Sequence, residues 1–175
     1  MNKKDNCDHS KCNTTNPNPS LAQTISEMDW EKGIWCAAFN GDKDKIQYLL
    51  QKSMIVSNTV NAPDNSGYTA LHYAARNGHL DICKMLIQNG ANINAATRSG
   101  KATPLHKAAA AGNTTAVTLL IKAGAAVELQ DVDGETALHK ASKHNNYNLI
   151  RVLLDACPHL YNIKDNKGNS AVTQM

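Results

Sequence analysis

The sequence predicts an all-α fold, a solenoid of helix–turn–helix units joined by β-hairpin-like fingers. Three observations predict it: one segment recurs, the recurrence is evenly spaced, and its apolar residues follow a helical period. The segment reads SGYTALHYAARNGH at Ser66–His79, SGKATPLHKAAAAGN at Ser99–Asn113 and DGETALHKASKHNN at Asp133–Asn146. Thr103 and Thr136 are 33 residues apart. A period of about 33 residues is typical of stacked units that bury their apolar faces against one another.

Each copy begins with a turn that leads into a first helix. The pattern D-x-x-G at Asp64–Gly67 and Asp131–Gly134 predicts a tight turn in which glycine supplies the positive φ. A threonine then takes the N-cap position of the helix, and Pro104 is suited to the first helical position of the second copy. The three threonines are Thr69, Thr103 and Thr136. The second turn carries one extra residue, because His72 and His106 are 34 residues apart.

The first helix has a face of small residues that lets a neighbouring backbone approach closely. These residues are Ala74, Ala75, Ala108, Ala109 and Ala141. The helix should end at a residue in the left-handed conformation, which glycine and asparagine tolerate best. The residues at that position are Gly78, Gly112 and Asn145. A second helix follows with apolar residues at helical spacing. They are Ile82, Leu86 and Ile87, then Val117, Leu120 and Ile121, then Ile150, Leu153 and Leu154.

These motifs resemble the ankyrin repeat, whose pattern is G-x-T-P-L-H-x-A-A, then G-H, then a leucine-rich second helix and G-A. The resemblance covers Gly33–Ala171. It implies that the T-x-L-H histidines, His72, His106 and His139, hydrogen-bond with the turn and with the neighbouring repeat. Histidines on consecutive repeats would lie about 10 Å apart, which is too far for one metal ion or one active site. We therefore expect these histidines to be structural.

The predicted organisation has seven segments. In chain order they are a disordered tail at 1–19, an amphipathic helix at 20–29, an atypical capping repeat at 30–63, ankyrin repeats at 64–97, 98–130 and 131–163, and an incomplete repeat at 164–175. The helix at 20–29 either docks on the first repeat or is loosely attached. Trp35 replaces the motif histidine in the capping repeat, as end repeats are often atypical. We expect the incomplete last repeat to leave the helix face near Leu149–Leu154 poorly covered, unless the chain continues or a partner covers it.

Composition and motifs argue against several classes of function. No run approaches the roughly 20 apolar residues of a membrane span, and the N-terminus lacks the apolar segment of a signal peptide. We therefore expect a cytoplasmic or nuclear protein with reduced cysteines. The formal net charge of +3 does not by itself indicate nucleic acid. Walker-type phosphate loops and HExxH motifs are absent from the sequence, and no paired carboxylates fall in an evident cleft. We therefore expect no enzyme, no catalytic residue, no cofactor and no small-molecule substrate.

Cysteines offer only weak candidates for chemistry. Cys7, His9 and Cys12 fall within six residues of one another, but a closed zinc site needs four ligands. For this segment we expect a disordered tail, and metal binding is the less favoured alternative. Cys36 and Cys83 fall on apolar helix faces and are expected to be inert. We expect no metal site.

The remaining candidate is a binding surface. The resemblance implies that partners bind the concave face, which is made by the finger tips and the first helices. Eight residues at such positions are candidate contacts: Tyr68, Tyr73, Arg76, Arg98, Lys101, Lys107, Lys140 and Lys143. Aromatic side chains and arginine often anchor interfaces, and the cations favour an acidic segment of a protein partner. The alternatives are an ordinary solvated face and a nucleic acid. A path for phosphates would be interrupted by three acidic residues of the third finger, Asp131, Asp133 and Glu135. Of these, Asp133 and Glu135 are expected to be exposed.

The resemblance also bears on Asn94 in the motif GANINA. Proteins of the ankyrin family often carry at this position an asparagine that an oxygen-dependent hydroxylase modifies. The alternative is an unmodified turn residue.

Overall fold

The structure is a computed structural model that describes residues 33–52 and 59–171. Within these ranges it contains eight α-helices and one 3-10 helix, and no strand beyond an isolated bridge between Lys164 and Ser170. The helices are α2 (Ile34–Asn40), α3 (Lys43–Lys52), α5 (Ala70–Asn77), α6 (Leu80–Gln88), α7 (Pro104–Ala110), α8 (Thr114–Lys122), α9 (Ala137–Lys143), α10 (Tyr147–Ala156) and the 3-10 helix η2 (Pro158–Asn162). This confirms the predicted all-α solenoid.

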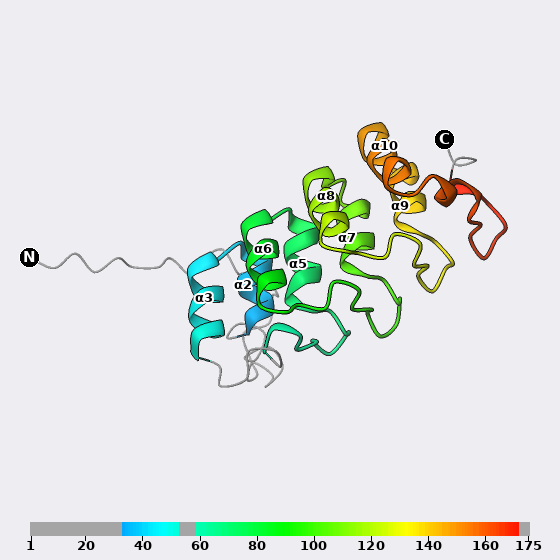
Figure 1. Ribbon diagram of the computed structural model, residues 1–175. Helices are drawn as coiled ribbons and strands as arrows, with labels where there is room; N and C mark the ends of the chain where they lie inside the picture. The colour runs from blue at the N-terminus through cyan, green and yellow to red at the C-terminus, as the bar shows by residue number, and fades with distance from the viewer. Residues whose placement is uncertain (1–32, 53–58, 172–175) are drawn as a thin grey trace, which may run out of the picture.

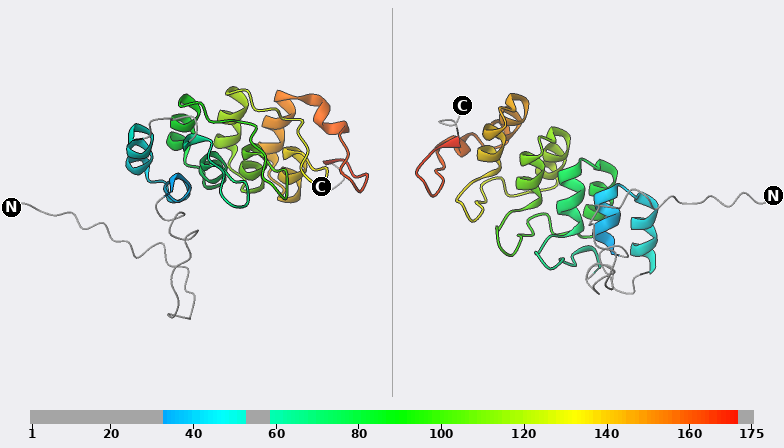
Figure 2. Two further views of the ribbon diagram at one scale, coloured as in Figure 1. Left: turned by 90° about the horizontal axis from the view of Figure 1, so that it is seen from below. Right: turned by 180° about the vertical axis from the view of Figure 1, so that it is seen from behind.

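The helices form antiparallel pairs that stack in chain order (Figure 1). The first helices of the pairs, α2, α5, α7 and α9, pack side by side in one layer, and the second helices α6, α8 and α10 pack in the other. The loops between pairs project to one side as fingers, as both views of Figure 2 show. The fold therefore presents one continuous surface of first helices and fingers.

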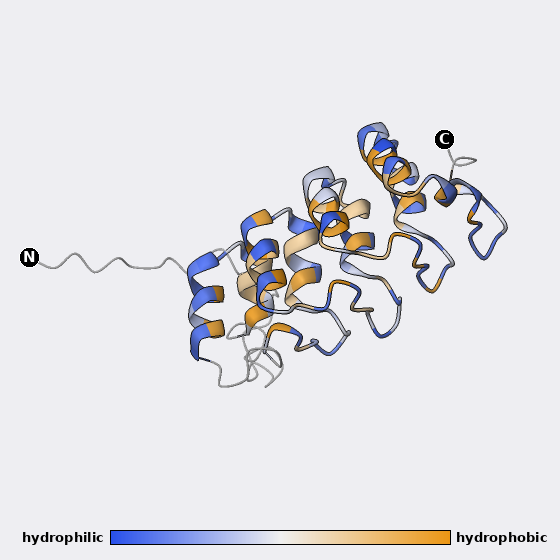
Figure 3. Cartoon of the chain, in the orientation of Figure 1, coloured by the Kyte–Doolittle hydropathy of each residue, from blue (hydrophilic) through white to orange (hydrophobic). Residues whose placement is uncertain are grey.

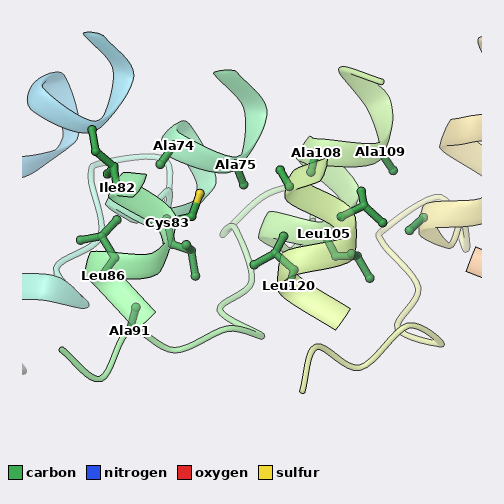
Figure 4. Close-up of a cluster of buried hydrophobic side chains, with 14 of the residues drawn as sticks. Ala74, Ala75, Ile82, Cys83, Leu86, Ala91, Leu105, Ala108, Ala109 and Leu120 are labelled. Carbon is green, nitrogen blue, oxygen red and sulfur yellow. The ribbon is translucent and has the colours of Figure 1, made fainter. Parts of the chain in front are cut away.

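The core between the two layers combines small and branched residues. All five alanines predicted for the small-residue face are completely buried, as are Leu86, Leu120 and Leu153 of the second helices. In Figure 4 the apolar side chains of α6 and α8 lie beneath the alanines of α5 and α7. Figure 3 shows hydrophobic residues concentrated on the helices and mostly hydrophilic ones at the finger tips. The small side chains allow the close packing of neighbouring first helices that the sequence predicts.

Histidine and threonine together begin each of the three first helices α5, α7 and α9. Thr69, Thr103 and Thr136 are their N-caps, and each forms a capping box with the histidine three residues later. The threonine N–H donates to Nδ1 of that histidine, at 3.0 Å in the pair Thr69–His72. Because Nδ1 accepts, the proton of the neutral ring is on Nε2.

The same histidines join consecutive repeats. Nε2 donates to a carbonyl of the next finger: His72 to Ala102 at 3.0 Å, His106 to Glu135 at 2.9 Å and His139 to Asn169 at 3.3 Å. In the first pair the Nε1–H of Trp35 instead donates to the carbonyl of Ala62 at 2.7 Å. The structural role expected for the histidines is therefore confirmed.

A second set of links joins the far ends of the first helices. In each case the side chain that follows the helix-ending glycine or asparagine donates to a carbonyl of the preceding repeat. The bonds are His79 to Phe39 at 3.0 Å, Asn113 to Arg76 at 2.5 Å and Asn146 to Gly112 at 3.2 Å. Gly78, Gly112 and Asn145 have the positive φ values that the sequence predicts. Each pair of helices is thus fastened to its neighbour at both ends of the first helix.

Neighbouring fingers are also joined, backbone to backbone. The Arg98 N–H donates to the Ser66 carbonyl, Val132 N–H to Gly100 and Asn166 N–H to Asp133, each at 3.0 Å. In the longer second turn Lys101 takes a positive φ of 48°, so the extra residue is absorbed in a conformation that costs a side chain energy. Gly67 follows Ser66, whose carbonyl accepts the first of these hydrogen bonds, and has a φ of 86°.

Replacing Gly67 with alanine is expected to destabilise the chain by about 2 kcal/mol. A Cβ there would lie 2.5 Å from the backbone N of Arg98 and would be forced into the left-handed region. Gly124→Ala is the matched control, because Gly124 has a φ of +93° and nothing within 4 Å of a Cβ. Urea unfolding should show a larger loss for Gly67→Ala, and equal losses would contradict close packing of the fingers.

The end of the stack is covered, which corrects one sequence prediction. Leu149 and Leu153 are completely buried, and Leu160 of η2 and Ala171 are buried with them in the same core. The expectation that the face near Leu149–Leu154 is poorly covered is therefore wrong for these residues. The 3-10 helix was missed because its only apolar signal is the single leucine between Pro158 and Tyr161.

Two predicted segments lie outside the described residues. They are the tail at 1–19, with Cys7, His9 and Cys12, and the helix at 20–29. Within the described residues, no helix combines the length and the apolar character needed to cross a membrane.

Candidate functional site

The eight predicted contact residues all belong to the surface of first helices and fingers, here called the finger–helix face. Arg76, Arg98, Lys101 and Lys143 are exposed, whereas Tyr68, Tyr73, Lys107 and Lys140 are partly buried. Tyr73 and Arg76 come from α5, Lys107 from α7, and Lys140 and Lys143 from α9; the others come from fingers. The structure divides these residues into two groups with different surroundings.

The first group is built around an aromatic cluster of Phe39, Tyr68 and Tyr73. The rings of Tyr68 and Tyr73 stack with centroids 5.3 Å apart, and Phe39 meets Tyr73 edge-on at 6.1 Å. Phe39 remains 43% exposed although it is a large apolar side chain. Sequence reasoning missed Phe39, because α2 belongs to the atypical first repeat. Its one distinguishing signal is that it is the only phenylalanine of the chain.

Asp64 fixes the orientation of this cluster. Its Oδ1 accepts hydrogen bonds from the amides of Ser66 and Tyr68, both at 2.8 Å, and so shapes the turn. Its Oδ2 accepts from the Tyr73 hydroxyl at 2.6 Å. Burial and the hydrogen bond to Asp64 raise the pKa of Tyr73, so its hydroxyl stays protonated. The turn carboxylate predicted from the D-x-x-G pattern therefore also holds a candidate contact residue in place.

Four of the predicted cations also belong to the first group: Arg76, Arg98, Lys101 and Lys107. The Nζ of Lys107 lies 4.8 Å from the centroid of the Tyr68 ring, within cation–π distance. The Arg98 guanidinium donates to the Asn65 carbonyl at 3.2 Å. No carboxylate among the described residues forms an ion pair with any of these four side chains. Within the described part of the chain no ion pair therefore neutralises these four charges, and the side chains of Arg76, Arg98 and Lys101 are exposed.

The second group, Lys140 and Lys143, is engaged within the protein. Lys140 forms ion pairs with Asp131 at 2.6 Å and Glu135 at 2.5 Å, and Lys143 pairs with Glu135. Glu135 is buried, so its placement as an exposed finger residue was wrong. Burial alone would raise the pKa of Glu135, but hydrogen bonds and charges from both lysines outweigh it and hold the pKa below its ordinary value. The two candidate cations of α9, Lys140 and Lys143, are thus neutralised by carboxylates of the third finger.

Two other features bear on chemistry. The carboxylates of Asp131, Asp133 and Glu135 lie within 4.8 Å of one another. The ammonium of Lys140 already forms ion pairs with two of them, Asp131 and Glu135. Cys36 and Cys83 are buried, and burial raises the pKa of the Cys83 thiol to about 12. A thiol with that pKa is a poor nucleophile at neutral pH.

Asn94 lies exposed in the loop after α6. Its N–H donates to Oδ1 of Asn92 at 3.1 Å, and its own Oδ1 accepts from the Ala126 N–H of the next repeat at 2.9 Å. The side chain is therefore already used as a link between neighbouring loops.

The chain resembles known proteins along most of its length. The family described as ankyrin repeats (3 copies) matches residues 9–97 and 95–167. Ankyrin repeat domain-containing protein 39 from Homo sapiens is 49% identical over 77 residues, which are 44% of this chain and 40% of that protein. The same-named protein from Bos taurus is 52% identical over 68 residues, 39% of this chain and 35% of that protein.

A third relative extends the match along this chain. BCL-6 corepressor-like protein 1 from Homo sapiens is 42% identical over 106 residues, 61% of this chain but only 6% of that protein. Each of these three matches thus spans less than half the length of the relative. Ankyrin repeats generally mediate protein–protein interaction. With the family match covering well over half of its residues, this chain belongs to the ankyrin repeat family.

Proposed function

We propose that this protein is a non-catalytic interaction module that binds an acidic segment of a protein partner on its finger–helix face. The observation that carries the proposal is a partly exposed aromatic cluster of Phe39, Tyr68 and Tyr73, with Lys107 over the Tyr68 ring, on the same face as three further cations. None of these four cations forms an ion pair with a described carboxylate. Interface centres are rich in aromatic residues and arginine. Acidic side chains of a partner would supply the missing counter-charges.

The rigidity of this region supports the same proposal. Tyr68 is fixed by the turn bonds of Asp64, and Tyr73 by its hydroxyl bond to the same carboxylate. The Arg98 backbone is tied to the finger before it. Side chains that are already ordered lose little conformational entropy when a partner binds. The contact region proposed here is therefore Phe39, Tyr68, Tyr73, Arg76, Arg98, Lys101 and Lys107, with Lys140 and Lys143 at its neutralised edge.

Nucleic acid is the alternative occupant of the same face. Phosphate binding requires a row of available cations, and the ion pairs of Lys140 and Lys143 shorten the row. Exposed aromatic rings can stack on unpaired bases, so single strands are the form that this face would suit. We favour a protein segment, because the two lysines at the third finger are already ion-paired and Lys107 lies over an aromatic ring.

The double charge reversal Arg98→Glu and Lys107→Glu is expected to weaken partner binding by about 1–3 kcal/mol. The substitution removes charge-assisted hydrogen bonds and adds repulsion toward an acidic segment. The measurement is quantitative affinity purification with mass spectrometry, followed by titration of an acidic peptide from the partner that is captured. Circular dichroism should show an unchanged fold, since neither charged group forms an ion pair with the described residues.

The matched control reverses Lys84 and Lys122, which are exposed on the second helices α6 and α8. This variant changes the net charge equally and should retain the partner. Equal retention by both variants would refute the finger–helix face as the contact. Loss of the partner after nuclease treatment, together with a steep fall of affinity with added salt, would instead identify nucleic acid as the ligand.

A further inference from the structure

Three side chains with different ligand atoms converge at the joint between the third and fourth helix pairs. Glu128 lies in the loop after α8, Cys157 is the C-cap residue after α10, and His159 lies in η2. The Cys157 Sγ is 3.3 Å from Oε1 of Glu128, and Nε2 of His159 is 3.6 Å from the same oxygen. All three ligand atoms lie within 4.8 Å of one another. Glu128 and Cys157 are 29 residues apart in sequence, so only the fold brings them together.

These separations match the edges of a zinc coordination tetrahedron. Zinc binds thiolate sulfur at about 2.3 Å, imidazole nitrogen at about 2.0–2.1 Å and carboxylate oxygen at about 2.0–2.2 Å. With tetrahedral angles, neighbouring ligand atoms are then about 3.3–3.6 Å apart. The S···O distance of 3.3 Å and the N···O distance of 3.6 Å are in that range, and the sulfur and the nitrogen lie within 4.8 Å of each other. Thiolate and imidazole together favour zinc over magnesium or calcium, which prefer oxygen ligands.

The backbone holds the three side chains in place from both sides. The Cys157 N–H donates to the Leu153 carbonyl at 3.0 Å, and its carbonyl accepts from Leu160 N–H at 3.2 Å. Leu160 is completely buried, so η2 is anchored in the core. On the other side, the Ala126 N–H is bonded to Asn94, and Gln130 donates to the Lys164 carbonyl at 2.9 Å. The loop that carries Glu128 is thus fastened before and after it.

The cluster is open to incoming ions. The side chains of Glu128 and His159 are 55% and 63% exposed, and no lysine or arginine among the described residues forms an ion pair with Glu128. In this it differs from the carboxylates of Asp131 and Glu135, where Lys140 already supplies the positive charge. A cation that enters the Glu128 cluster displaces no protein group.

We propose that Glu128, Cys157 and His159 bind one Zn²⁺ ion, with a water molecule as the fourth ligand. Binding exchanges the proton of the Cys157 thiol for the metal, and that proton passes to solvent. The ion then connects the loop after α8 to the end of α10 and stabilises the last helix pair against its neighbour. The sequence expectation of no metal site considered the tail and the three motif histidines, and not Glu128, Cys157 and His159, which only the fold brings together.

The test is a titration of the full, reduced chain with Zn²⁺ against a chromophoric indicator. We expect one equivalent to bind, and Co²⁺ in its place to show a thiolate charge-transfer absorption band. Cys157→Ser, His159→Ala and Glu128→Gln should each weaken binding by more than about tenfold, because even partners outside the ligand shell cost 10- to 100-fold. Zinc should also raise the melting temperature of the unsubstituted chain, since the site is assembled only on folding.

Two control variants separate this site from others in the chain. Cys7→Ser with Cys12→Ser removes the thiols of the tail, and His144→Ala removes an exposed histidine of the same helix pair. Both should bind zinc as the unsubstituted chain does. No binding, binding that survives Cys157→Ser, or binding lost with the tail thiols would each overturn the proposal and leave a hydrogen-bonded surface cluster only.

Discussion

Replacing His106 with alanine is expected to lower the free energy of unfolding by about 2–4 kcal/mol. The substitution removes the hydrogen bond from Nε2 to the Glu135 carbonyl and the one that Nδ1 accepts from the Thr103 N–H. Both partners lie among buried residues, so each loses a hydrogen bond where water has little access. Urea unfolding followed by circular dichroism measures the effect. Because domains of this kind are stabilised by only about 5–15 kcal/mol in total, the loss should be obvious.

The position of His106 also predicts where the damage appears. It joins α7 to the finger of the next repeat, so hydrogen exchange should accelerate in α9 and its finger as well as in α7. His144→Ala is the control, because His144 is an exposed histidine after α9. An unchanged unfolding midpoint for His106→Ala, with a binding activity lost, would show that the histidine has a functional role.

Much of the fold could be predicted because a repeat presents its evidence several times. Thr69, Thr103 and Thr136 each precede a histidine by three residues, and the structure uses all three pairs alike. Helix-ending glycines and buried alanines follow the same period. Each unit depends on contacts with its sequence neighbours, so a pattern with one period describes both the local structure and the packing.

Other features depend on side-chain contacts that the pattern does not describe. The repeat pattern predicts both Lys140 and Glu135 as surface residues, and only their distance in the folded finger shows that the lysine is neutralised. Phe39 joins Tyr73 across two helices of unlike repeats. Glu128 meets Cys157 and His159 where α10 is followed by the 3-10 helix η2, which has no counterpart among the described residues of the units before it. Departures from the period therefore carry most of what is specific to this protein.

Acidification is expected to destabilise the fold between pH 6.5 and pH 4. Burial, with a smaller contribution from the nearby Lys107 charge, lowers the pKa of His72 from 6.5 to about 4, against the opposing effects of backbone carbonyls and Asp64. The unfolded chain takes up a proton in this range while folded His72 stays neutral. Stability is therefore complete above pH 6.5 and is lost as the pH falls toward 4, by about 3 kcal/mol in all and about 2 kcal/mol by pH 5.

The structural reason is that Nδ1 of His72 already accepts from the Thr69 N–H, so protonation there breaks a buried hydrogen bond. Burial also lowers the pKa of His106, which adds to the effect in the same direction. Despite the opposing effect of desolvation, the pKa values of three carboxylates, Asp131, Glu135 and Asp165, are lowered by hydrogen bonds from the ordinary 3.8 of aspartate and 4.5 of glutamate. Protonation of these carboxylates therefore reduces stability mainly at lower pH.

The measurement is urea unfolding at pH 7 and pH 5, with a chelator present to remove metal ions. The unsubstituted chain should lose about 2 kcal/mol or more between the two pH values. His72→Gln, which removes the titrating group, should lose correspondingly less, whereas the His144→Ala control should behave as the unsubstituted chain does. If His72→Gln keeps the full loss, the pH dependence comes from other groups, and the neutral buried imidazole is not what acid disrupts.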